Sequence, residues 1–159
     1  GFGSMPPSKR LAVVIMELAR SGKHRFVVQK STVAPLLTHN TPGIFLIDSA
    51  PHSKLFPLLS AAIHHGGSGT THTAARAAIP QIIVPYSFDQ YYWGDMAWRA
   101  GIAPKPITRR SLSSENLATA LLHAPLFKRK AGELALAIQH RNGLNKALDH
   151  IENILMERA

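Results

Sequence analysis

The chain has 159 residues, of which 45% are apolar and 17% charged, a length and balance that fit one domain with a full hydrophobic core. It contains no Cys, which excludes a disulfide framework and a thiolate metal site, and its apolar runs are too short to span a bilayer. The net charge of +9 favours anionic partners, but the basic residues lie in short, scattered clusters with few aromatic residues beside them, which argues against a nucleic-acid surface.

The first part of the chain is predicted to alternate between helix and strand. Residues 8–21 place apolar side chains at three- and four-residue spacing, which indicates an amphipathic helix that Gly22 ends. Two short apolar runs, residues 25–29 and 43–48, indicate strands, the second of the kind that is buried on both faces. A third strand is expected at residues 59–64 and runs into a glycine-rich turn.

A helix is expected over residues 70–78, and Pro80 separates it from a strand at residues 81–84. Asp89 is expected to cap a further helix that reaches Ala100. These elements continue the strand–helix alternation that the first part of the chain begins.

The last part of the chain is predicted to be mostly helical. Residues 102–107 contain two prolines, which favours an extended segment at a sheet edge, and residues 113–123 indicate a helix. The tail is helical in period, with an apolar side made of Leu134, Ile138, Leu144, Leu148, Ile151 and Leu155. Together the elements predict an α/β fold, a Rossmann-like doubly wound parallel sheet, in a single domain over residues 1–159. Ligands of such sheets bind beyond the carboxyl ends of the strands, where the glycine-rich turn falls.

The glycine-rich turn is the most informative functional signal. Its glycines let a phosphate approach the backbone, and the helix that follows begins with Thr70 and Thr71, where the helix dipole favours an anion. A ring N–H of His65 can donate to a phosphate oxygen. A turn that needs glycine only for packing is the alternative, but the full pattern His-His-Gly-Gly-Ser-Gly-Thr-Thr favours phosphate binding.

Two further segments carry weaker signals. The loop Gly1-Phe2-Gly3-Ser4 precedes the first helix and is a second candidate phosphate contact. Asp89 and Gln90 follow the strand at residues 81–84, and are either a helix cap with a polar neighbour or a carboxylate and an amide that bind sugar hydroxyls. No carboxylate or Cys lies at metal-ligand spacing from the clustered histidines, so no metal site is expected.

In order and spacing, several motifs together resemble the C-terminal, donor-binding half of a glycosyltransferase of the GT-B fold. The nearest branches are the sterol 3-beta-glucosyltransferases and the bacterial enzymes that glycosylate lipids or natural products. The matching motifs cover about two thirds of the chain: Gly1-Phe2-Gly3-Ser4-Met5, Ala50-Pro51-His52, Leu55-Phe56-Pro57, His64 through Thr71, Ile79-Pro80, Val84-Pro85, Asp89-Gln90 and Trp93-Gly94.

The resemblance implies a role for each matching position. Asp89 and Gln90 would bind the hexose hydroxyls, and Ala50 and His52 would meet the nucleobase. The donor would be a UDP- or dTDP-sugar, bound without a metal ion or other cofactor. Its diphosphate would be held by Ser4, His65, Gly67, Ser68, Gly69 and Thr70.

Three positions depart from the family pattern and concern base and ribose recognition. Ser49 stands where plant-type members carry a Trp that stacks on the base, and Thr73 stands where they carry an acid for the ribose. Residues 53–54 are Ser-Lys where sterol-type members often have Asp-Trp. The choice among UDP, dTDP and other donors therefore stays open.

The resemblance also implies parts that lie outside this chain. The catalytic base and most of the acceptor pocket would belong to an N-terminal domain, and the first strand of the donor domain would lie immediately before Gly1. The hypothesis is one half of an inverting glycosyltransferase that moves a hexose to a hydroxyl of a lipid, sterol or natural product, inactive as this chain alone. The alternative is a stand-alone or split-subunit nucleotide-sugar-binding module. A cytoplasmic location is expected, with an anionic membrane surface as a further candidate partner.

Overall fold

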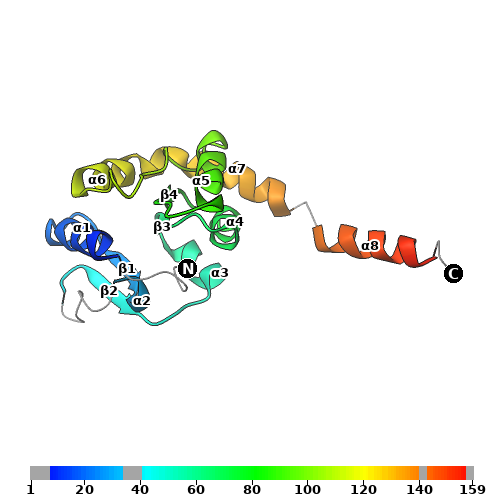
Figure 1. The fold of residues 1–159 in the computed structure, drawn as a ribbon, viewed down its shortest axis with the longest axis horizontal. Helices are drawn as coiled ribbons and strands as arrows, with labels where there is room; N and C mark the ends of the chain where they lie inside the picture. Colours follow the sequence, from blue (N-terminus) through cyan, green and yellow to red (C-terminus); the bar gives the residue numbers. More distant parts are fainter. Residues whose placement is uncertain (1–7, 34–40, 140–142, 157–159) are drawn as a thin grey trace.

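The structure is a computed structural model that describes residues 8–33, 41–139 and 143–156 (Figure 1). Helix α1, Lys9–Arg20, begins where the Ser8 hydroxyl accepts a bond from the Leu11 N–H at 3.2 Å. It ends before Gly22, whose φ of +71° suits a left-handed stop. The predicted first helix is therefore confirmed.

Two strands follow α1 and pair in parallel. Strand β1, Phe26–Gln29, continues into the short helix α2, Lys30–Val33, and pairs with β2, Ile44–Ile47. Phe26 lies opposite Ile44 in the register. Both predicted strands are confirmed in position, but the prediction that the second is buried on both faces is wrong, because Phe45 is 77% exposed and Leu46 and Ile47 are only half-buried.

The segment before the glycine-rich turn differs from its prediction. Helix α3, His52–Leu55, and the 3-10 turn η1, Phe56–Leu58, occupy the residues before strand β3, Ala62–His64. The strand is shorter than the predicted 59–64, because the Leu59 N–H closes the 3-10 turn on Phe56 O at 3.0 Å and Ala62 is the first residue in register with Gln81 of the next strand.

Helix α4, Ser68–Arg76, connects β3 to the parallel strand β4, Gln81–Ile83, and α5, Asp89–Arg99, follows. Residues 102–107 form no regular strand, but they lie along β4 as expected. The Gln81 N–H donates to Ile102 O at 3.0 Å, and the Ile107 N–H donates to Ile83 O at 2.9 Å.

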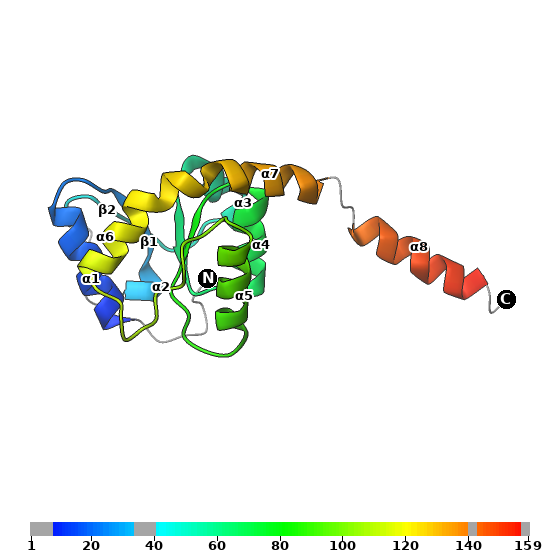
Figure 2. The same cartoon turned by 90° about the horizontal axis from the view of Figure 1, so that it is seen from above.

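The C-terminal part is helical, as predicted. Helix α6, Ser114–His123, is capped by the Ser113 hydroxyl and leads through η2, Ala124–Phe127, into α7, Lys128–Gln139. The Leu134 and Ile138 side chains of α7 pack on a core cluster. Helix α8, Gly143–Met156, extends away from the rest of the molecule in both views (Figures 1 and 2). The apolar side chains of α8 whose burial the structure describes are exposed: Leu148, Ile151, Ile154, Leu155 and Met156. Among the described residues, the predicted apolar side of the tail therefore packs on the core only along α7, where Leu134 and Ile138 are half-buried.

The described strands form two separate parallel pairs, β1–β2 and β3–β4, where a single sheet was predicted. A cavity of about 610 Å³ lies between them, lined by β1 on one side and β3 on the other. The predicted α/β class with parallel strands is confirmed. None of the described helices is long and apolar enough to cross a membrane.

Three buried clusters hold the elements around the β3–α4 junction. The largest joins α1, β1 and β2 to Ile82, Val84 and Leu117. A second joins Ile83 of β4 to α4, α5 and α7, and a third packs beneath α4. Strand β4 is fully buried and contributes to two of these clusters. The glycine-rich turn therefore follows a strand that is paired with a firmly packed neighbour.

Candidate functional site

The glycine-rich turn lies between the end of β3 and the start of α4, at the carboxyl end of a parallel strand. Gly66 has a φ of +91°, a conformation that L side chains rarely adopt. A Cβ atom placed on it would lie 2.9 Å from both Gln90 O and Ile83 Cγ2. Glycine is required at this position for its backbone conformation and for its close approach to α5.

Gly67 is the N-cap of α4, and no side chain caps this helix. The Thr71 N–H donates to Gly67 O at 3.0 Å, as the first bond of the helix. The N–H groups of Ser68 and Gly69 precede that bond and have no partner within the helix. They point out of the helix start, where the dipole favours an anion.

The His65 ring lies against the start of α4. A Cβ atom on Gly67 would lie 2.6 Å from His65 Nε2, so glycine is needed here to admit the ring. Burial lowers the pKa of His65, while the nearby Asp89 carboxylate opposes that shift. The imidazole is therefore neutral at neutral pH and has one N–H to donate.

The two threonines of α4 differ in their roles. The Thr71 hydroxyl donates to Gly67 O at 3.0 Å, the oxygen that also receives the Thr71 N–H. The hydroxyl and the N–H of Thr71 therefore both serve to close the first turn of α4. Thr70 is buried and lines the cavity between β1 and β3.

The Asp89–Gln90 pair lies at the start of α5, beside the glycine turn. Asp89 was predicted to cap α5, and this is wrong: Phe88 is the N-cap, with a φ of +44°, and Asp89 is the first helical residue. The N–H groups of Tyr86 and Ser87 donate to Gln90 Oε1 at 2.8 and 3.2 Å. That oxygen holds the turn before α5, so any contact of Gln90 with a sugar hydroxyl depends on its nitrogen end. The exposed Asp89 carboxylate lies close enough to His65 to influence its pKa.

The two residues expected to meet a nucleobase, Ala50 and His52, are half-buried and line the same cavity as Thr70. The His52 ring stacks on Phe56 with a centroid distance of 4.6 Å and an interplanar angle of 11°. Burial lowers the pKa of His52. Ser4, the remaining predicted diphosphate contact, lies outside the described residues.

One polar pair beneath the turn was not predicted. His64 Nε2 lies 2.9 Å from Gln81 Oε1, and both side chains are buried. A glutamine at the head of the apolar run 81–84 was the available signal, since a buried amide requires hydrogen-bond partners. Within the described part of the chain, no three side chains of metal-ligating type come together.

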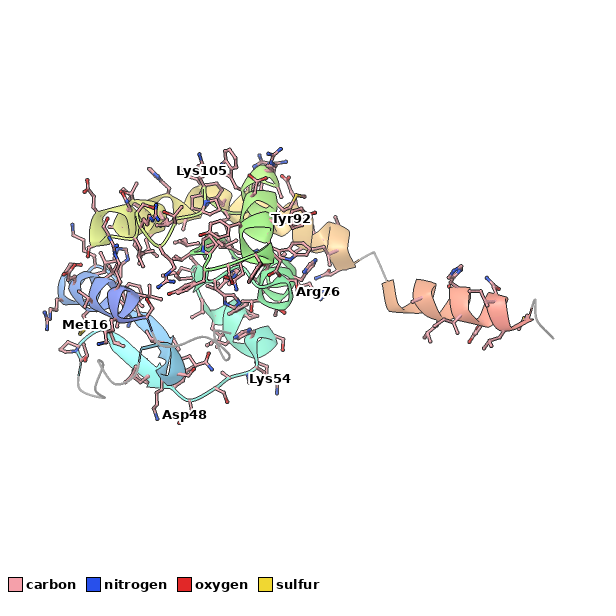
Figure 3. The ribbon with its side chains drawn as sticks, in the orientation of Figure 1. Met16, Asp48, Lys54, Arg76, Tyr92 and Lys105 are labelled. Atoms are coloured by element: carbon pink, nitrogen blue, oxygen red, sulfur yellow. The ribbon has the colours of Figure 1, made fainter. Side chains whose placement is uncertain are left out.

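The outer surface around α4 and α5 is polar and aromatic. Figure 3 shows the labelled Arg76 and Tyr92 on the side of the molecule that α4 and α5 form. The His72 ring of α4 meets the Trp93 ring of α5 edge-on, with centroids 4.9 Å apart. This contact is part of the packing between α4 and α5, the helix that begins with the Asp89–Gln90 pair.

Comparisons with known proteins agree with this architecture. A sterol 3-beta-glucosyltransferase of Arabidopsis thaliana is 37% identical over 155 residues, which is 94% of this chain and 25% of that protein. The chain therefore spans about a quarter of that relative's length. The solved glycotransferase of kitacinnamycin has the same fold, with a TM-score of 0.85 at 17% identity over 94% of this chain and 40% of that one. The glycosyltransferase VinC, solved in complex with dTDP, has a TM-score of 0.63 at 25% identity over 79% of this chain and 32% of that one.

Residues 13–139 match the family described as erythromycin biosynthesis protein CIII-like, C-terminal domain. This match covers the glycine-rich turn, the Asp89–Gln90 pair and both pairs of strands. The chain belongs to this family of C-terminal, donor-binding domains of GT-B glycosyltransferases.

Proposed function

We propose that this domain binds the UDP- or dTDP-sugar donor of an inverting glycosyltransferase that transfers a hexose to a hydroxyl of a sterol, lipid or natural product. The observation that carries the proposal is the His65 ring against the start of α4, beside Gly67 and next to Asp89. This arrangement places a side-chain donor and outward-pointing amides at one point. A carboxylate able to accept from hydroxyls lies beside them.

The chemistry follows from the charge that develops on the leaving group. When an acceptor hydroxyl attacks the anomeric carbon, the bond to the diphosphate breaks and negative charge grows on its oxygens. His65 and the amides of Ser68 and Gly69 would stabilise that charge, with no proton transfer required of them. The base that takes the acceptor proton is proposed to lie in an N-terminal domain, so we expect no turnover by this chain alone.

The remaining contacts are proposals on the same basis. Gly67, Ser68, Gly69 and Thr70 would surround the diphosphate, with Ser4 as a further contact. Asp89 and the nitrogen end of Gln90 would bind the hexose hydroxyls. The nucleobase would lie near Ala50 and His52, on the cavity side of the turn.

Isothermal titration calorimetry with UDP, dTDP and their glucose conjugates tests this proposal. The parent chain is expected to bind one diphosphate, and His65→Ala is expected to weaken binding by roughly tenfold, the value of a lost hydrogen bond to a charged group. Unchanged diphosphate affinity in His65→Ala would contradict the assignment of His65. Measurable sugar transfer by this chain would contradict the placement of the base elsewhere.

We also propose that a further parallel strand completes the sheet in the cavity between β1 and β3. Ala62 N–H donates to Pro80 O and His64 O accepts from Val84 N–H, each at 2.9 Å, so Ala62 and His64 bond toward β4. Because alternate residues of a parallel strand bond to opposite sides, Ile63 directs its backbone groups toward the cavity. Its proposed source is a strand immediately before Gly1, which the resemblance to GT-B donor domains implies. Lengthening the chain by the coding sequence upstream of Gly1 should protect the Ile63 amide from hydrogen exchange, and unchanged exchange would contradict this.

The alternative function is a nucleotide-sugar-binding module, stand-alone or a split subunit, without catalysis of its own. It would use the same residues for the donor and differ only in the source of the acceptor site. The coding sequence upstream of Gly1 distinguishes the two: an in-frame acceptor domain supports the enzyme, and a nearby start codon supports the split subunit.

An anionic membrane surface is a further candidate partner, favoured by one polar hollow. Arg10, Arg109 and Arg110 line it together with hydroxyl-bearing residues, and none of the described residues that line it is acidic. By contrast, Arg129 and Lys130 of the 128–130 cluster pair with Glu133. Sedimentation with vesicles containing phosphatidylserine should therefore depend on Arg109 and Arg110. Equal sedimentation with neutral vesicles would contradict an electrostatic contact.

A further inference from the structure

A chain of buried polar groups runs beneath the glycine-rich turn. The Gly66 N–H donates to His64 Nδ1 at 3.0 Å, and His64 Nε2 lies 2.9 Å from Gln81 Oε1. Gln81 Nε2 in turn donates to Thr71 O at 3.2 Å. The His64 and Gln81 side chains lie on β3 and β4, the Thr71 carbonyl lies on α4, and all three residues are buried.

These bonds determine the form of the His64 imidazole. Because Nδ1 accepts from an N–H, the ring proton must be on Nε2, from which it donates to Gln81. The Gln81 amide is thereby oriented with its nitrogen toward Thr71. Burial lowers the pKa of His64 to about 3, so the ring is neutral throughout the physiological range. A second proton, on Nδ1, would point at the Gly66 N–H and remove the hydrogen bond between them.

This series of hydrogen bonds links the backbone N–H of Gly66 to the backbone carbonyl of Gly67. Gly66, with its left-handed φ, is held through its N–H by His64. Gly67 is held through its carbonyl by Thr71, whose own carbonyl accepts from Gln81. The amides that follow, at the start of α4, are the groups proposed to receive the diphosphate.

We propose that His64 is a positioning residue for the donor diphosphate: it fixes the backbone of Gly66 and so sets the start of α4 for the anion without touching it. The inference rests on the proposed function, since it assigns a supporting role beneath that site. His64 and His65 then have separate roles. His65 contacts the ligand, and His64 positions the backbone that contacts it.

Two substitutions each remove one of the two hydrogen bonds of the His64 ring and keep the other. In His64→Asn, the side-chain oxygen lies near the position of Nδ1 and can still accept from the Gly66 N–H, but the bond to Gln81 is lost. In His64→Gln, the longer amide can still reach Gln81, but Gly66 loses its acceptor. Each variant loses one buried bond, so both are expected to be less stable than the parent, and stability alone does not distinguish them. Ile82→Val, in the fully buried β4, is the matched control for a stability loss that leaves these bonds intact.

The experiment measures UDP affinity by calorimetry and Gly66 amide exchange by NMR in the 159-residue chain. We expect His64→Asn and Ile82→Val to bind UDP within about threefold of the parent, and His64→Gln to bind roughly tenfold more weakly, with fast Gly66 exchange. Equal losses in the two His64 variants, or no loss in either, would overturn the positioning role. If the parent protects Gly66 but binds no UDP, the proposed function fails and the ligand side of this inference fails with it. If the parent does not protect Gly66, the positioning itself is refuted.

Discussion

Substituting Gly69 tests whether a glycine is required by the fold or by the ligand site. It lies in the first turn of α4, its φ is not positive, and a Cβ atom placed on it would meet no protein atom within 4 Å. Alanine costs the fold nothing at such a site and removes backbone entropy from the unfolded chain, so Gly69→Ala should raise the free energy of unfolding by about 0.5–1 kcal/mol. The open space that the added methyl enters is where we place the diphosphate. Displacing one charge-assisted bond there costs about 1.5–3 kcal/mol, so UDP should bind at least roughly tenfold more weakly.

The assay combines urea unfolding with calorimetric titration of UDP. Gly132→Ala is the matched control, because Gly132 also lies in a helix with open space around its Cβ position, on α7. It should gain similar stability and leave UDP affinity unchanged. A stabilised Gly69→Ala that binds UDP as tightly as the parent would refute the assignment of Gly69. A lower free energy of unfolding in Gly69→Ala would contradict the prediction that the fold accepts alanine at this position.

Further predictions concern the turn, the sugar contact and two histidines. Gly66→Ala should lower the free energy of unfolding by about 2–4 kcal/mol, measured by urea unfolding, because it adds left-handed strain to a clash with Gln90 O. Asp89→Asn should weaken UDP-glucose but not UDP in calorimetry, and equal losses would place Asp89 outside the sugar site. UDP-glucose affinity should rise as pH falls from about 8 to 6, because burial lowers the pKa of free His65 and a bound diphosphate would raise it; His65→Gln should remove this dependence. The free energy of unfolding should fall below pH 6.5 by up to about 1.4 kcal/mol per pH unit, because His64 has an ordinary pKa in the unfolded chain and a pKa lowered by burial to about 3 in the folded chain. Charges on His65 and His52 also lower the pKa of folded His64. His64→Asn should reduce this pH dependence.

Local sequence patterns were sufficient to predict most of the elements. The 8–21 helix and the strands at 25–29 and 43–48 follow from spacing alone, and the structure places them within a few residues. Local rules also located the glycine turn at the carboxyl end of a strand. The start of β3 was misplaced because the Leu59 N–H closes the preceding 3-10 turn, a bond that the apolar pattern of residues 59–64 does not reveal.

Tertiary contacts explain what the sequence did not reveal. His64 and Gln81 are 17 residues apart and meet only because β3 and β4 pair in parallel, so no spacing rule predicts their bond. The N-cap of α5 was misassigned to Asp89. The side chain of Gln90, inside the helix, accepts from the Tyr86 N–H in the preceding turn, and the N-cap is Phe88. Whether an apolar helix face is buried, as on α7, or exposed, as on α8, also depends on neighbours that periodicity does not identify.

The most direct test of donor binding at the glycine-rich turn is an NMR titration of the chain with UDP, following each backbone amide. We predict that the largest shifts occur at Gly67, Ser68, Gly69 and Thr70, with smaller shifts near Ala50 and His52. Shifts centred instead on the hollow lined by Arg10, Arg109 and Arg110, or no shifts with UDP at millimolar concentration, would contradict the proposed site.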